Sequence, residues 1–163
     1  MKHYKAIFFD WDGTAVLSRK APVEDAVNAM RPLLDKGVKL CIVSGTTYEN
    51  IAGGKLHSYF TPKQLENLYL GLGRGAFDYG YNTAGEPTVL VDRVPDAKGI
   101  LAVHDACYRI HRGLLEKYGM NTDIVFSRPN YCKIDLMPAN NRGENLFLQE
   151  GEAARLQHIL RQH

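Results

Sequence analysis

Two carboxylates lie one residue apart near the start of the chain, in the sequence Asp10-Trp11-Asp12-Gly13-Thr14. Like charges this close repel each other unless a cation, a proton or hydrogen-bond donors offset them. Carboxylate oxygens are the ligands that Mg²⁺ prefers in proteins. We therefore predict that Asp10 and Asp12 hold a divalent metal. The alternative is a solvated turn in which an Asp side chain caps the backbone.

Hydroxyl side chains and a glycine form a second group of residues that could bind a ligand, Ser44-Gly45-Thr46-Thr47. A hydroxyl and free backbone N–H groups can donate to a phosphate, and a glycine lets such a ligand approach closely. The same residue types also favour the N-cap of a helix, here one expected over residues 48–56 and interrupted by Gly53-Gly54. Beside the two carboxylates, phosphate binding is the preferred interpretation.

The elements around these two groups explain why the groups should meet. Residues 6–9 and 38–43 are short apolar runs, which are typical of strands covered on both faces. Between them, apolar residues recur every three or four positions over residues 23–36, and this spacing predicts an amphipathic helix. Such a unit makes the two strands parallel neighbours. Their carboxyl ends then share the sheet edge at which open α/β sheets bind ligands.

The first motif, Asp10 to Thr14, resembles the DxDGT motif of the haloacid dehalogenase superfamily, and Val43-Ser44-Gly45 resembles the second motif of that family. The resemblance implies an α/β fold whose core is a Rossmann-like parallel sheet. It also implies that Asp10 is a nucleophile that takes the phosphoryl group as an aspartyl-phosphate. Asp12 would protonate the leaving oxygen and later activate water.

The same resemblance implies a Mg²⁺ cofactor and a phosphate site. Asp10 and the backbone carbonyl of Asp12 would ligate the metal, and the phosphate-binding residues would be Gly13, Thr14, Ser44 and Gly45. An Asp at position 12 provides a second acid/base carboxylate. That residue favours a phosphatase or a phosphomutase over a dehalogenase.

The middle of the chain contains a sequence that fits G-x-G-x-x-A, at residues 71–76. A dinucleotide site needs a helix after this motif, whereas residues 77–93 alternate in polarity around the turn sequence Asn82-Thr83-Ala84-Gly85. We therefore predict a third strand over residues 67–70 followed by a β-hairpin, with no dinucleotide cofactor. Arg74 lies between them, and we interpret it as a solvated loop residue, with a position facing the cleft as the alternative.

Val94-Pro95-Asp96 marks the predicted domain boundary, giving a core over residues 1–95 and a second domain over residues 96–163. The second domain is expected to contain a helix that ends at Gly119, strands over 123–126 and 131–137, and a last helix over about 150–161. His104, Cys107 and His111 share roughly one face of the first of these helices. We interpret them as core and boundary residues and not as a metal site, because Cys107 belongs to the apolar stripe.

Residues 127–138 resemble the cap domain of phosphomannomutase-type and Cof-like sugar phosphatases, so residues 96–163 are predicted to be a partial α/β cap. In that family, arginines of a similar hairpin hold the distal phosphate of the substrate. The likeness implies that Arg128 and Arg142 bind substrate, with Lys133 a weaker candidate. Exposed basic residues without a ligand are an equal alternative.

Composition narrows the classes of partner. With 163 residues, 45% hydrophobic and 23% charged, the chain is typical of a soluble globular protein. Its net charge of +2 indicates neither a nucleic acid nor an acidic membrane as partner. No stretch is long and apolar enough for a signal sequence or a membrane span. Three widely spaced cysteines suit reduced thiols, so we predict a cytoplasmic protein.

Two motifs of the family have no counterpart in this sequence: a lysine that offsets charge, and an acidic pair that completes the metal site. In members with this cap type both follow the cap, so the chain resembles the N-terminal part of a longer enzyme. Two classes of function remain. One is a Mg²⁺-dependent phosphatase or phosphomutase acting on a small phosphorylated metabolite, most plausibly a sugar phosphate. The other is a non-catalytic phosphate-binding protein. The sequence predicts no oligomeric state.

Overall fold

The computed structural model describes residues 4–120, 122–126 and 130–135, together with the single positions 154, 157, 158 and 161. The chain divides into two compact units, Met1–Val94 and Pro95–His163.

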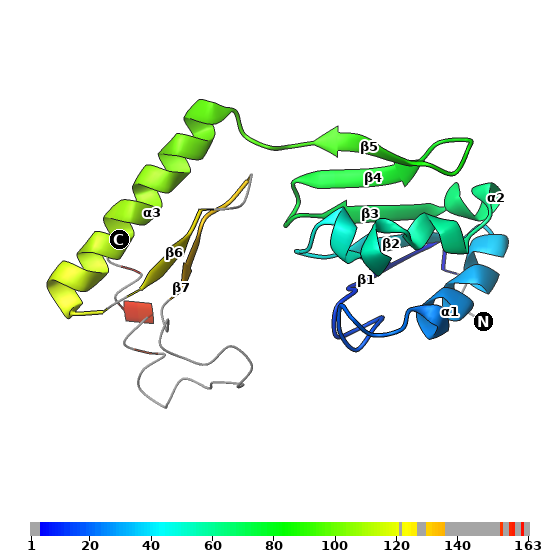
Figure 1. Ribbon diagram of the computed structural model, residues 1–163, viewed down its shortest axis with the longest axis horizontal. Helices are drawn as coiled ribbons and strands as arrows, with labels where there is room; N and C mark the ends of the chain where they lie inside the picture. Colours follow the sequence, from blue (N-terminus) through cyan, green and yellow to red (C-terminus); the bar gives the residue numbers. More distant parts are fainter. Residues whose placement is uncertain are drawn as a thin grey trace. The chain divides into compact units, whose positions relative to one another are not determined.

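The first unit is built on a five-stranded mixed sheet (Figure 1). The strands follow one another in sequence order across the sheet: β1 (Ala6–Phe9), β2 (Lys39–Val43), β3 (Leu68–Leu72), β4 (Phe77–Tyr81) and β5 (Pro87–Asp92). The first three are parallel, and β4 and β5 are antiparallel to their neighbours. The predicted parallel pairing of β1 and β2 is therefore confirmed, and β1 lies at an edge of the sheet.

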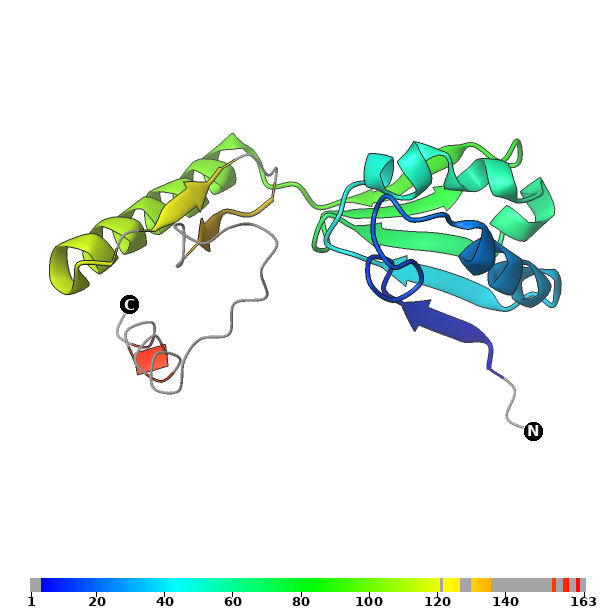
Figure 2. The same ribbon diagram turned by 60° about the horizontal axis from the view of Figure 1, so that its bottom comes forward.

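Helical segments pack against one face of this sheet, as Figures 1 and 2 show. They are α1 (Glu24–Asp35), the 3₁₀ turns η1 (Tyr48–Asn50), η2 (Ala52–Gly54) and η3 (Leu56–Tyr59), and the short α2 (Pro62–Leu65). Alternate strand residues such as Ile42 and Leu70 bury their side chains beneath these segments, together with Val27 and Leu34 of α1. The opposite face carries apolar side chains that are exposed, including Phe8 at 70% and Val43 at 51%.

The interruption predicted at Gly53-Gly54 is confirmed, but the α-helix predicted on either side of it over residues 48–56 is wrong, because the segment forms separate 3₁₀ turns. Ala52, Gly53 and Gly54 all have positive φ angles, of 50°, 63° and 76°. A continuous right-handed helix excludes this left-handed backbone conformation. The hairpin predicted after the third strand is confirmed: β4 and β5 pair antiparallel, and the Asn82 side chain accepts backbone hydrogen bonds across the turn.

The second unit consists, in its described residues, of a long helix and a two-stranded antiparallel sheet. The helix α3 (Ala97–Tyr118) begins at Asp96, whose side chain accepts from the Gly99 N–H, and ends at Gly119 in the left-handed conformation, as the sequence predicts. The strands are β6 (Asp123–Val125) and β7 (Lys133–Asp135). The last helix, predicted over about 150–161, falls mostly on residues outside those described.

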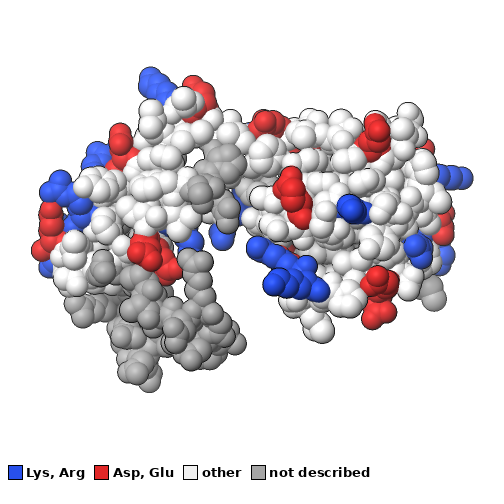
Figure 3. Space-filling model, in the orientation of Figure 1, with Lys and Arg blue, Asp and Glu red and all other residues white. Residues whose placement is uncertain are grey.

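Two side chains that raised the idea of a metal site have other contacts in this unit. The His111 Nδ1 atom lies 2.6 Å from the Thr122 hydroxyl, and the His104 ring packs edge-on against Phe126. Of the helices in the described residues, none combines the length and apolar character needed to span a bilayer. Figure 3 shows basic and acidic side chains interspersed over the described part of the visible face, in keeping with the small net charge.

Candidate functional site

A tight loop directly after β1 holds the two carboxylates. The Trp11 side chain is buried, with 1% exposed, and its carbonyl oxygen accepts hydrogen bonds from the N–H groups of Thr14, Ala15 and Val16. The Gly13 N–H donates to the Val16 carbonyl at 2.7 Å, and Gly13 has a φ of +79°, a conformation that favours glycine. Trp11 therefore anchors the loop in the core, with Asp10 and Asp12 on either side of it along the chain.

The two carboxylates have different surroundings. Asp10 is exposed and lines a cleft. Asp12 is partly buried, and its Oδ2 atom accepts a hydrogen bond from Arg19 Nε at 3.0 Å. Its other oxygen, Oδ1, is buried and accepts no hydrogen bond from any described residue. A buried carboxylate oxygen without a donor is costly, so this atom is suited to receive a proton or a cation.

The loop after β2 presents the second predicted group of residues. The Ser44 N–H donates to the Gly71 carbonyl at 3.0 Å, and the Ser44 hydroxyl faces the Thr46 N–H at 3.4 Å. The alternative role of this group as a helix N-cap falls to Thr47, which holds the N-cap position before η1 without a capping hydrogen bond from its side chain. Ser44 instead stands at the carboxyl end of β2, next to the end of β1.

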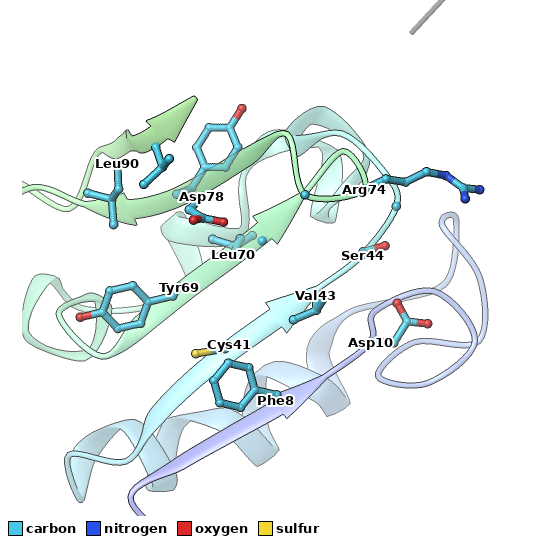
Figure 4. A pocket seen from close by; sticks show the side chains of 15 residues that line it. Phe8, Asp10, Cys41, Val43, Ser44, Tyr69, Leu70, Arg74, Asp78 and Leu90 are labelled. Atoms are coloured by element: carbon cyan, nitrogen blue, oxygen red, sulfur yellow. The ribbon is translucent and has the colours of Figure 1, made fainter. Parts of the chain in front are cut away.

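A cleft of about 800 Å³ joins these residues (Figure 4). Asp10, Ser44 and Gly45 lie at the carboxyl ends of the parallel strands, and exposed apolar side chains of the sheet face continue the lining. Asp12, Gly13 and Thr14 are not among the lining residues and lie in the adjacent loop. The structure thus brings Asp10, Ser44 and Gly45 to one cleft and keeps the other three predicted residues beside it.

Two further groups set the charge and polarity of the cleft. The Cys41 thiol lines it on β2, and burial raises the pKa of this thiol, with Lys39 opposing the shift. Asp78 of β4 also lines the cleft, where Arg93 Nη2 donates to its Oδ2 atom at 2.6 Å. This hydrogen bond raises the pKa of Arg93. Asp78 is thus already paired with a cation.

The oxygen donors at the end of β1 fit a Mg²⁺ ion in type. Asp10 offers a carboxylate and Asp12 its backbone carbonyl, both hard oxygen ligands, and Mg²⁺ commonly takes only one or two protein carboxylates, with water and substrate phosphate completing its shell. This leaves the buried Asp12 Oδ1 atom to carry a proton. Among the described residues, no group of three or more His, Cys, Asp or Glu side chains gathers in a way that could hold a metal. The fit therefore rests on one carboxylate and one carbonyl oxygen.

Sequence reasoning missed Arg19 and set Arg74 aside. Arg19 follows Asp12 by seven residues without a motif that would mark it, and only the fold of the loop brings it to the carboxylate. Arg74 is exposed in a turn, as interpreted, and it also lines the cleft, which is the alternative that the sequence left open. Arg128 and Arg142 lie outside the described residues. Lys133, the weaker candidate, pairs with Asp135 at 3.2 Å.

No family model and no curated protein matches the sequence. Among solved structures, the IMP-bound, N-terminally truncated IMP-nucleotidase of Plasmodium falciparum matches with a TM-score of 0.62 and 13% identity, over 97% of this chain and 46% of that chain. An IMP-bound mutant of the same enzyme gives a TM-score of 0.65 and 13% identity, over 98% of this chain and 45% of that one. A haloacid dehalogenase-like hydrolase from B. subtilis matches more weakly, with a TM-score of 0.43 and 20% identity, over 74% of this chain and 36% of that chain.

At these identities the likeness defines the fold alone. The chain spans less than half the length of the nucleotidase structures that it matches. Its α/β architecture, with three parallel strands and an antiparallel hairpin, is the one predicted for the core. The predicted fold class, an α/β fold with parallel strands at its core, is thereby confirmed, and the chain shares this fold with the nucleotidase structures.

Proposed function

We propose that this chain is part of a Mg²⁺-dependent phosphatase of the haloacid dehalogenase superfamily, which hydrolyses a phosphate monoester through a covalent intermediate on Asp10. The main support for this proposal is the arrangement of the two strand ends. Asp10 shares a cleft with Ser44 and Gly45 at the carboxyl ends of two paired strands, while Asp12 stands beside it with a buried, unpaired oxygen. A nucleophile, phosphate donors and an acid/base group are thus available together.

In the first step a carboxylate oxygen of Asp10 attacks phosphorus, and the bond from phosphorus to the leaving oxygen breaks. Asp12 donates a proton to that oxygen, so the product leaves as a neutral alcohol. The Ser44 hydroxyl and nearby backbone N–H groups bind the oxygens of the phosphoryl group that do not react. A carboxylate nucleophile divides a difficult hydrolysis into two easier steps.

In the second step a water molecule attacks the phosphorus of the aspartyl-phosphate. Asp12, now ionised, takes a proton from that water, and inorganic phosphate leaves as the Asp10 carboxylate is restored. Arg19 keeps Asp12 oriented through its hydrogen bond to Oδ2. When bound by Asp10 and Asp12, Mg²⁺ would supply positive charge that offsets the negative charge of the phosphoryl group.

The substrate we propose is a small phosphorylated metabolite in the cytoplasm, with neither a nucleic acid nor a membrane as partner. The resemblance of residues 127–138 to a sugar-phosphatase cap favours a sugar phosphate. Solved structures of similar fold are of an IMP-nucleotidase with IMP bound, which favours a nucleoside monophosphate. We propose that residues 96–163 serve as the cap over the core of residues 1–95 and take part in this choice.

The test is hydrolysis of p-nitrophenyl phosphate, a hexose phosphate and IMP in the presence of Mg²⁺. Asp10→Asn should reduce phosphate release to background, because an amide is a poor nucleophile, whereas the exposed Asp25→Asn in the first turn of α1 should retain activity. Activity that survives Asp10→Asn would refute the nucleophile assignment. Removal of Mg²⁺ by a chelator should also abolish turnover.

A second candidate is a phosphate-binding protein that performs no chemistry. It is favoured by the acidic residues at the site, since among the described residues no third acidic ligand lies near Asp10 and Asp12. Phosphate binding by calorimetry without turnover of any of the three substrates would support it. A phosphomutase, the remaining alternative, would isomerise a hexose phosphate without net release of phosphate.

A further inference from the structure

We propose that Arg74 selects substrates that carry a second anionic group besides the phosphoryl group that is transferred. This inference rests on the proposed function, since it assumes that a phosphate binds beside Asp10 and Ser44. It assigns to the turn between β3 and β4 the task of recognising the rest of the substrate.

The backbone at Arg74 has a conformation that its residue type disfavours. Gly73, Arg74 and Gly75 have consecutive φ angles of 62°, 56° and 88°. Glycine adopts such angles freely and asparagine fairly often, but a residue with a long side chain does so at a cost in free energy. A strained residue of this kind is most often retained where its side chain has a task.

The turn is fixed against the phosphate-binding loop. The Gly73 N–H donates to the Thr46 carbonyl at 2.8 Å. A Cβ atom built on Gly45 would lie 3.4 Å from Arg74 Cγ and 3.6 Å from its Nε atom, so the Arg74 side chain packs directly on the backbone of Gly45. These contacts hold the guanidinium group beside the site where the phosphate would bind.

The direction of the side chain indicates what it contacts. Figure 4 shows Arg74 extending from its turn past Ser44 and beyond the ends of the strands, and not down toward Asp10. Arg74 leaves the sheet at β3, two strands from β1, and so about 10 Å from the strand that carries Asp10. The guanidinium group, which borders the phosphate-binding loop and extends away from Asp10, is therefore directed at a part of the substrate beyond the phosphoryl group that Asp10 attacks.

The charge of the cleft indicates the chemistry of that part. Among the described residues that line the cleft, Arg74 is the only Lys or Arg, so it is the positively charged side chain at this part of the lining. A guanidinium group presents a planar fork that matches a carboxylate or phosphate bidentately. We therefore expect a substrate with a carboxylate or a second phosphate within reach of the transferred phosphoryl group.

Binding by calorimetry in Mg²⁺ tests this without turnover. The probes are alkylphosphonates and ω-carboxyalkylphosphonates of matched length, from two to four carbons, which share the phosphonate and differ in the carboxylate. The wild-type chain should bind at least one carboxylated probe about tenfold more tightly than its matched alkyl probe. Arg74→Asn should remove this preference and change the affinity for alkylphosphonates less than twofold.

Two controls separate recognition from a structural role. Arg74→Asn should raise the melting temperature, since asparagine suits the left-handed backbone better, so loss of the preference would accompany a gain in stability. Arg74→Lys should retain part of the preference, because it keeps the charge without the planar fork.

A wild-type chain without the preference, or an Arg74→Asn variant that weakens both probe series equally, would overturn the inference and leave the proposed function standing. If the wild-type chain bound neither series, the proposed function would fail and this inference with it.

Discussion

The orientation of the Asp12 carboxylate depends on its contact with Arg19. Its Oδ2 atom is bonded to Arg19, in a pair whose side chains are 57% and 26% exposed for Arg19 and Asp12 respectively. An exposed ion pair contributes only about 0–1 kcal/mol to folding. The value of the contact is therefore in orienting the carboxylate that we propose as acid and base.

We expect Arg19→Gln to change the free energy of unfolding by less than about 1 kcal/mol and to lower kcat several-fold with little change in KM. Denaturant unfolding and steady-state kinetics measure the two quantities. Arg112→Gln is the matched control, because it breaks an exposed pair with Glu116 in the second unit. Equal kcat values for the two variants would contradict the orienting role.

Gly45 and Gly13 make a contrasting pair of glycines. Gly45 has an ordinary backbone angle, but an added methyl group would meet Arg74 and fill the approach to the loop. Gly13 has space around it but a φ of +79°. The first residue therefore serves the approach of a ligand and the second serves the conformation of the loop.

Accordingly, Gly45→Ala should weaken binding of inorganic phosphate about tenfold while leaving the melting temperature nearly unchanged. Gly13→Ala should cost about 1–3 kcal/mol in stability because the left-handed conformation strains alanine. Calorimetric titration and thermal unfolding of both variants measure this. Tight phosphate binding by Gly45→Ala would argue against a ligand at this loop.

At the scale of elements, the strands and the amphipathic helix α1 were predictable because each has one dominant apolar period. In the segment from Tyr48 to Tyr59, the interruption at Gly53 and Gly54 was predictable because glycine permits positive φ angles, but the 3₁₀ turns were not, because the apolar residues fit an α-helix. Burial of Ile51 and Leu56 under the sheet then decides the outcome. Tertiary packing outweighs local pattern there.

The site was predictable in part for a related reason. Asp10 and Ser44 each end a strand, so the topology alone places them together. Arg74 depends on a contact between the Gly73 N–H and Thr46, and Arg19 depends on how a loop folds back on Asp12. Such contacts are set by the register of the sheet and the path of a loop, and no local spacing in the sequence signals them.

The packing of α3 near β7 has a consequence for pH. Burial, followed by a hydrogen bond with Cys107, raises the pKa of the Cys132 thiol to about 11. The folded state therefore keeps this proton over the range in which the unfolded chain loses it. Stability from this group is complete below the ordinary thiol pKa and is lost as the pH rises toward 11.

We expect Cys132 to react with iodoacetamide far more slowly than an ordinary thiol at pH 9, and to become reactive only as the pH approaches 11. Mass spectrometry of the modified peptides follows each cysteine separately. The unfolded chain in denaturant gives the reference rate for the same peptide. Equal rates in the folded and unfolded chains at pH 9 would contradict the raised pKa.

At the scale of the whole molecule, the division into two units predicts separable stability. Leu114 of α3 is the fully buried residue of that helix, at 0% exposed, while Leu115 is 47% exposed. Leu114→Ala should cost about 2–5 kcal/mol through the cavity that it leaves. Because each unit has its own contacts, the loss should remain within Pro95–His163.

Hydrogen exchange read by mass spectrometry distinguishes the two units. Leu114→Ala should increase exchange in α3 and β6, while β1, β2 and β3 keep their wild-type protection. Leu115→Ala is the matched control, because it makes the same substitution at an exposed position of α3, and it should change hydrogen exchange in neither unit. Increased exchange throughout the core sheet would show instead that the units fold as one.

Trp11 gives the site an optical probe. It is the only tryptophan of the chain, it is buried, and peptide bonds join it directly to Asp10 and Asp12. Its emission therefore comes from one place, and charge arriving at either carboxylate should alter its intensity. Titration with Mg²⁺ and phosphonate should give a saturable fluorescence change that Asp10→Asn diminishes, so that occupancy of this site can be followed in an unlabelled protein.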